Sequence, residues 1–171
     1  VHHSAENYNL TVSFRLSWVQ HFKIAFMIPV ALCGFHPVVI FIVNQISVLF
    51  QFWQHTEYIG RLPKIFEWIF VTPSNHRVHH GSDEKYIDKN FGAIFIFWDK
   101  IFGTYVPEQE KPTYGITKPI TPTLDPLHLN FHEYKDMIAD VKKAKSLRKK
   151  LFFVFASPGK IHREKLKQMS G

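Results

Sequence analysis

The longest apolar stretch of the chain is divided in two by Gly-Phe-His-Pro at residues 34–37. Ile24–Phe35 has 12 residues and Val38–Trp53 has 16. One helical crossing of a bilayer needs about 20 predominantly apolar residues, so neither part is a full span. The break predicts a helical hairpin over about residues 22–54 that enters a membrane. A pair of buried helices in a soluble protein is the alternative.

Polar positions within the second part of the hairpin follow helical spacing. Asn44, Gln51 and His55 are separated by seven and four residues, so they share one face. Polar groups at membrane depth usually face the interior of a helix bundle and mark function. We therefore expect this face to turn towards protein, with His55 at the end of the helix.

The rest of the chain predicts shorter elements. Thr72 and Pro73 fit the N-cap and the first position of a short helix that ends near Gly81. The remaining predictions are a helical stretch after Leu10, an amphipathic piece over Ile65–Val71, an interfacial helix over Asn90–Tyr105, an ordered loop or extended cover over Val106–Pro126 and a helix from about Phe131 to Lys150. The sequence thus predicts an all-α fold.

Charge separates the C-terminal part from the rest. The formal net charge is +7, and residues 142–167 carry ten Lys and Arg against one acidic residue. No base-stacking module accompanies this charge, so we expect no nucleic-acid partner. The basic run at residues 142–150 is followed by the apolar segment Leu151–Phe155, which favours attraction to anionic lipid headgroups. A solvated helix face is the alternative.

Three histidines provide the candidate chemistry. His76, His79 and His80 are three and four residues apart, so on a helix their imidazoles face one volume. Imidazole binds iron, zinc, copper and nickel, and the spacing alone leaves the metal open. Two further histidines, His2 and His3, are adjacent near the start of the sequence. No HExxH motif occurs, which excludes a metalloprotease of that type.

Several motifs in a fixed order resemble the membrane-bound fatty acid hydroxylase and sterol desaturase superfamily. They are VHHSAENYNLTVSFR, QFWQHTEYIG, TPSNHRVHHGSDEKYIDKNFG and WDKIFGTY. The resemblance extends to about residue 119. It implies a histidine-box catalytic domain over residues 1–119, followed by a basic helical tail over residues 120–171.

The resemblance also implies a ligand set. Members hold two metal ions, iron in the active enzymes, with histidine boxes of the forms HxxxH and HxxHH. The matching positions here are His2, His3, His55, His76, His79 and His80. The first box and the first histidine of the middle box would precede Val1, so we interpret the chain as a fragment.

Acidic and amide side chains near these histidines are further candidates. Glu57 or Glu6 could offset the charge of the two ions. Asp83, Asp88 and Asn90 follow the histidine triple and could orient the ligand rings, although surface turn residues are the alternative.

The function implied by the resemblance is a membrane-bound non-haem diiron oxygenase that hydroxylates a lipid with O₂. The substrate would be an ether lipid, a fatty acyl chain or a sterol, and tetrahydropterin is a candidate reductant, with the electron donor not identified. The metal site would lie in a helical cap on the cytosolic face of a bacterial inner membrane or the endoplasmic reticulum. A zinc-binding structural module without catalysis is the alternative.

Overall fold

The computed structural model of the chain describes residues 2–14, 23–116 and 125–169, and its elements there are helical. An isolated bridge between Phe70 and Phe95 is the extended pairing recorded in this part. The all-α prediction is confirmed for the described residues. The chain divides into two compact units, Val1–Thr117 and Lys118–Gly171. The predicted boundary after residue 119 lies outside the described residues.

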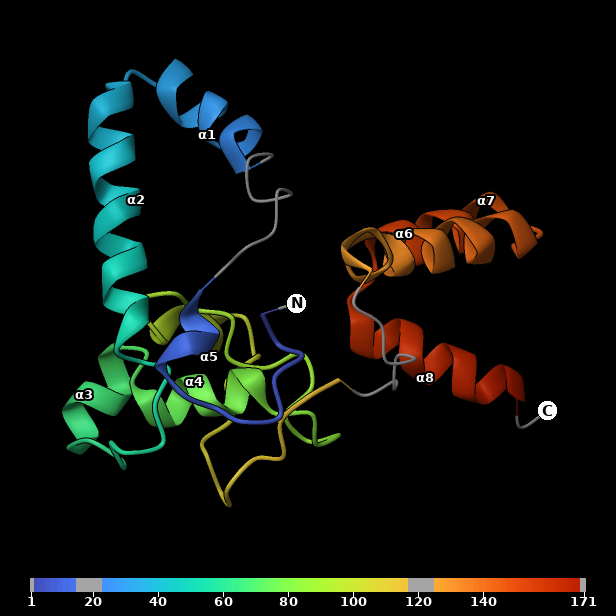
Figure 1. Cartoon of the computed structure of the whole chain (residues 1–171). Coiled ribbons are helices and arrows are strands. Elements are labelled where there is room, and N and C mark those ends of the chain that lie inside the picture. The colour runs from blue at the N-terminus through green and yellow to red at the C-terminus, as the bar shows by residue number, and fades with distance from the viewer. Residues whose placement is uncertain (1, 15–22, 117–124, 170–171) are drawn as a thin grey trace. The chain divides into compact units, whose positions relative to one another are not determined.

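The predicted hairpin is present in the first unit. α1 (Lys23–Leu32) and α2 (Pro37–Phe52) are joined by a short turn (Figure 1). Gly34 adopts φ +96°, which favours glycine, and the Nδ1 atom of His36 accepts a hydrogen bond from the Val38 amide. His36 is therefore the N-cap of α2, a structural role.

The two hairpin helices expose apolar side chains. None of the residues of α2 is buried. Exposed apolar side chains include Ile24, Phe26, Ile28, Val39, Phe41, Ile42, Val43, Ile46, Val48 and Leu49. Within the described ranges, no helix has both the length and the apolar character needed to cross a membrane.

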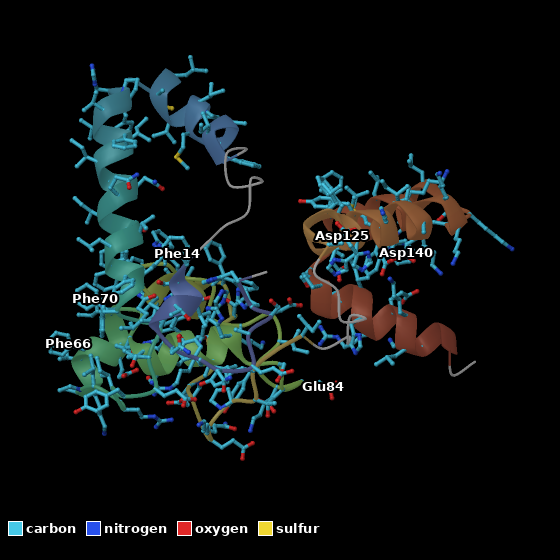
Figure 2. The ribbon with its side chains drawn as sticks, in the orientation of Figure 1. Phe14, Phe66, Phe70, Glu84, Asp125 and Asp140 are labelled. Carbon is cyan, nitrogen blue, oxygen red and sulfur yellow. The ribbon has the colours of Figure 1, made fainter. Side chains whose placement is uncertain are left out.

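Shorter elements make up the rest of the first unit. They are the 3₁₀ helix η1 (Leu10–Ser13) and the helices α3 (Lys64–Ile69), α4 (Pro73–His80) and α5 (Phe97–Ile101). η1 lies where a helical stretch is predicted after Leu10, and residues 15–22 of that prediction lie outside the described residues. Figure 2 shows Phe66 and Phe70 side by side at the end of α3, with ring centroids 6.4 Å apart.

The predicted helix over Asn90–Tyr105 is wrong, since α5 is the helical part of this segment. The preceding loop is held by Asp99, whose two carboxylate oxygens accept hydrogen bonds from the amides of Phe91 and Gly92 at 2.7 and 2.8 Å. The loop backbone also turns through Asn90 at φ +51°. A buried carboxylate that binds backbone amides stabilises this loop against a helix.

The second unit contains α6 (Pro126–Lys143), α7 (Leu147–Phe155) and α8 (Pro158–Met169). The single helix predicted over Phe131–Lys150 is wrong, because the backbone is extended at Ala144 and Ser146 begins a new helix by capping the Lys149 amide. Asp140, labelled on α6 in Figure 2, pairs with Lys165 of α8 at 2.5 Å.

Candidate metal centre

Helix α4 carries the histidine triple and begins as the sequence predicts. The Thr72 side chain accepts a hydrogen bond from the Asn75 amide, and Pro73 occupies the first helical turn. Asn75 in turn donates to the carbonyl of Phe70 at 3.2 Å. These bonds fix the start of α4, and the start of the helix sets the directions in which its histidines point.

Four histidines from three separate segments form a compact group. One ring nitrogen from each of His2, His55, His76 and His80 lies within 4.8 Å of the others. The Nε2 atom of His55 is 3.4 Å from Nε2 of His2 and 3.0 Å from Nε2 of His76. Two nitrogens bound to one ion at about 2.1 Å would lie about 3.0–3.4 Å apart, for bond angles between 90° and tetrahedral. The spacing fits shared coordination of one ion.

The two other candidate histidines lie against this group. The ring of His3 stacks on that of His80 with centroids 4.1 Å apart, and it lies 4.8 Å from the ring of His79. His79 also lies 5.3 Å from His76. The structure thus brings together all the histidines proposed as ligands, and metal binding by each of them stays a prediction.

Backbone carbonyls orient three of the rings. The Nδ1 atom of His2 lies 2.5 Å from the carbonyl oxygen of Val12, and that of His55 lies 2.8 Å from the carbonyl oxygen of Gln51. The Nδ1 atom of His79 lies 3.3 Å from the carbonyl oxygen of Lys89. A carbonyl only accepts hydrogen bonds, so each Nδ1 carries the proton. In a neutral ring Nε2 then carries the lone pair, which is the arrangement that metal-binding histidines use.

Burial keeps the rings of His76 and His80 neutral. Burial, together with neighbouring histidines, lowers the pKa of His76 and of His80 well below the ordinary value. Within the described residues, Nδ1 of His76 and Nε2 of His80 are buried without a hydrogen-bond partner. A bound cation would satisfy such a nitrogen, and neutral imidazole is the form that binds metal.

The acidic and amide candidates have other contacts. Glu57 pairs with Lys111 at 3.0 Å, and Asp83 accepts a hydrogen bond from the amide of Thr113. Asn90 donates to the carbonyls of Asn75 and Val106, so it supports the backbone of α4. Glu6 is exposed and lies outside the compact group, and Asp88 adopts φ +60°.

Arg77 is a residue whose role the sequence does not indicate. Its guanidinium donates to both carboxylate oxygens of Glu108, at 2.6 and 2.8 Å, and to the carbonyls of Thr56 and Ile59. Burial lowers the pKa of Arg77, but the hydrogen bonds and charge of Glu108 reverse this, so the net shift is upward. Arg77 therefore ties the segment after His55 to α4.

Two tyrosines also lie at the centre without a sequence signal. Tyr8 is buried, donates to the carbonyl of Gln54 at 3.0 Å and lies 5.2 Å from the His80 ring. The Tyr8 ring also stacks on that of Tyr114, with centroids 4.8 Å apart. Burial is the main cause that raises the pKa of both tyrosines above the usual value, followed by the Tyr114 phenol for Tyr8 and by the Glu57 carboxylate for Tyr114. Both tyrosines are protonated at neutral pH.

An apolar cavity of about 730 Å³ opens between η1 and the hairpin. It is lined by Ser13, Phe14, Ile24, Met27, Ile28, Ala31, Pro37, Ile40, Phe41, Asn44, Val48, Gln51, Phe52 and His55. Asn44, Gln51 and His55 thus lie on one cavity, as their spacing predicts. His55 belongs both to this cavity and to the compact histidine group.

Comparison with known proteins agrees with this geometry. The fatty acid hydroxylase family model matches residues 1–104. The chain is 42% identical to an alkylglycerol monooxygenase of Xenopus tropicalis over 159 residues, which cover 92% of this chain and 35% of that protein. It is 41% identical to the alkylglycerol monooxygenase of Homo sapiens over 165 residues, with the same coverage.

A more distant relative has the same name. The alkylglycerol monooxygenase of Caenorhabditis elegans is 34% identical over 140 residues, which cover 81% of this chain and 27% of that protein. The chain spans about a third of the length of these curated relatives. No solved structure matches it. The family match covers the segments that carry His2, His55 and His76, and by this match the chain belongs to the fatty acid hydroxylase family.

Proposed function

We propose that the whole protein is an iron-dependent oxygenase that hydroxylates a lipid with O₂. One observation carries the proposal: His55 lines a large apolar cavity and also contributes its Nε2 atom to the compact histidine group. A lipid chain in the cavity would therefore end beside the ligands. The names of the family and of the relatives support a lipid-oxidising activity.

Two iron ions held by His2, His3, His55, His76, His79 and His80 would supply the activation of O₂ for attack on a C–H bond, chemistry that side chains alone do not provide. The carbonyls of Val12, Gln51 and Lys89 hold the protons on Nδ1 and direct Nε2 inward. The apolar walls around the cavity exclude water and place the lipid chain.

The substrate we favour is an ether lipid. The relatives are named alkylglycerol monooxygenases, and their match extends over most of this chain. Fatty acyl chains and sterols remain alternatives, since the cavity walls are apolar and suit all three. Tetrahydropterin is the proposed reductant on the same grounds of resemblance.

The protein is proposed to act in a membrane with its metal centre on the cytosolic side. The exposed apolar side chains of α1 and α2 support contact with lipid. Six Lys and Arg within residues 142–150 support a cytosolic position for the tail, because such residues concentrate on that side of membranes.

The competing function is a zinc-stabilised structural module, favoured by the compactness of the four-nitrogen group. The whole protein, loaded with ferrous iron without oxygen and then exposed to O₂ and an alkylglycerol, separates the two. We expect bound iron, O₂ consumption and oxidised lipid. Zinc retention with no O₂ consumption by iron-loaded protein would overturn the proposed function.

A further inference from the structure

A pair of stacked aromatic rings leads away from the histidine group. The Tyr8 ring lies 5.2 Å from that of His80 and 5.9 Å from that of His55. The ring of Tyr114 is nearly parallel to that of Tyr8, with centroids 4.8 Å apart and planes inclined by 14°. The rings are thus in contact from the proposed ligands to Tyr114.

A charged cavity of about 440 Å³ is lined by a carboxylate that acts on Tyr114. Glu57 lines it, and the Glu57 carboxylate is also among the groups whose charge acts on Tyr114. Arg77, Glu108 and Lys111 line the same cavity. A small polar reductant could approach here, next to the carboxylate that acts on Tyr114.

Packing does not explain the hydroxyl of Tyr114. By distance and angle this buried hydroxyl makes no regular hydrogen bond in the described part of the chain, and the Glu57 carboxylate is close enough to act on it as an acceptor. A buried polar atom without a partner costs about 1–3 kcal/mol, and phenylalanine would fill the same space without that cost. Such atoms in native proteins call for an explanation, and redox chemistry is one.

We propose that Tyr8 and Tyr114 form a two-step path for electrons between the metal centre and the charged cavity. The inference rests on the proposed function, because it needs an iron centre oxidised by O₂. The path would supply electrons when O₂ has reacted and no lipid is present, and so protect the histidines from oxidation.

The steps balance. In each pass the Tyr8 O–H bond, whose hydrogen is donated to the Gln54 carbonyl at rest, would break and give one electron to the oxidised centre and one proton to oxygen derived from O₂. Two passes would supply the two electrons and two protons with which one such oxygen atom leaves as water. Tyr114 then gives one electron and one proton to restore Tyr8. A soluble one-electron reductant, ascorbate in the test below, gives one electron and one proton to restore Tyr114 and is itself oxidised.

The test uses the whole iron-loaded protein mixed with O₂ without lipid, frozen at intervals and measured by electron paramagnetic resonance. We expect a tyrosyl radical in the unmodified protein that Tyr8→Phe abolishes. In Tyr114→Phe the radical should persist, and its decay in ascorbate should slow at least tenfold. Tyr58→Phe is the matched control, because Tyr58 is 97% exposed and its removal should change neither signal nor decay.

The outcomes separate the two proposals. Iron binding and lipid oxidation without a radical, or with a radical that survives in Tyr8→Phe, would overturn the path and leave the proposed function standing. Failure to bind iron or to consume O₂ would overturn both. Ring-deuterated tyrosine in the unmodified protein provides a check that needs no variant: the radical spectrum should narrow, and an unchanged spectrum would overturn the path.

Discussion

Removal of a single proposed ligand is the direct test at the scale of residues. We expect His79→Ala and His80→Ala in the whole protein to abolish turnover and to lower iron content. Loss of a group that merely orients a ligand costs about 10–100-fold in metal affinity, and loss of a ligand should cost more. Iron per protein and product per iron are the measurements.

The matched controls lie in the second unit. His128 and His162 are on α6 and α8, outside the histidine group. Their replacement by alanine should leave iron content and turnover nearly unchanged. An equal loss in all four variants would count against the ligand assignment.

The buried neutral histidines predict a pH dependence of stability. The pKa values of His76 and His80 in the folded protein lie below the unfolded value of about 6.5, so the unfolded state binds more protons as pH falls below about 6.5. The free energy of unfolding of the metal-free protein should then decrease as the pH is lowered below about 6.5, by up to about 1.4 kcal/mol per pH unit and per histidine.

Thermal unfolding at pH 7.5 and 5.5 measures this effect. A variant with His76→Asn and His80→Asn cannot titrate at these positions, so it should show the weaker dependence on pH. If the stability of the variant decreased as steeply between pH 7.5 and 5.5, the pH dependence would come from groups other than His76 and His80.

At the scale of elements, Arg77 connects α4 to the segment after α2. Replacement of Arg77 by alanine would leave the carboxylate of Glu108, which is 13% exposed, buried without its partner. The expected loss in unfolding free energy is about 3–5 kcal/mol, with weaker iron binding because His55 and His76 are no longer held together.

Lys111→Ala is the control for this change. Lys111 pairs with Glu57 at the surface, with side chains 74% and 38% exposed, so its loss should cost about 0–1 kcal/mol. Chemical denaturation of both variants, with iron content measured alongside, tests the difference. Similar losses in the two variants would show that the Arg77 contacts are not special.

At the scale of the whole molecule, the hairpin and the basic tail predict orientation. If α1 and α2 enter a membrane and return to the side they came from, the histidine group and residues 142–150 lie on one side, which we expect to be the cytosol. Protease outside sealed cells should then spare the tail until the membrane is opened. Digestion from outside would place both the tail and the source of electrons on the other side.

Local pattern by itself determines several elements. Thr72 and Pro73 start α4, and residues 34–37 separate α1 from α2, because caps, prolines and glycines act on backbone groups only a few residues away. Helical spacing singles out His76, His79 and His80, while the full set of proposed metal ligands comes from a resemblance of motifs. Helix prediction is wrong over residues 90–105 and across Ala144, where Asp99 and Ser146 bind backbone amides instead.

Tertiary structure alone decides the contacts between distant residues. Tyr8 and Tyr114 are 106 positions apart in the chain and Arg77 and Glu108 are 31 apart, yet their side chains meet around one centre. Nothing in the residues near each of them predicts the partner, because stacking and ion pairing depend on side-chain geometry and not on sequence distance. The sequence determines the histidines and the start of the helix that carries His76, His79 and His80, and folding determines what surrounds them.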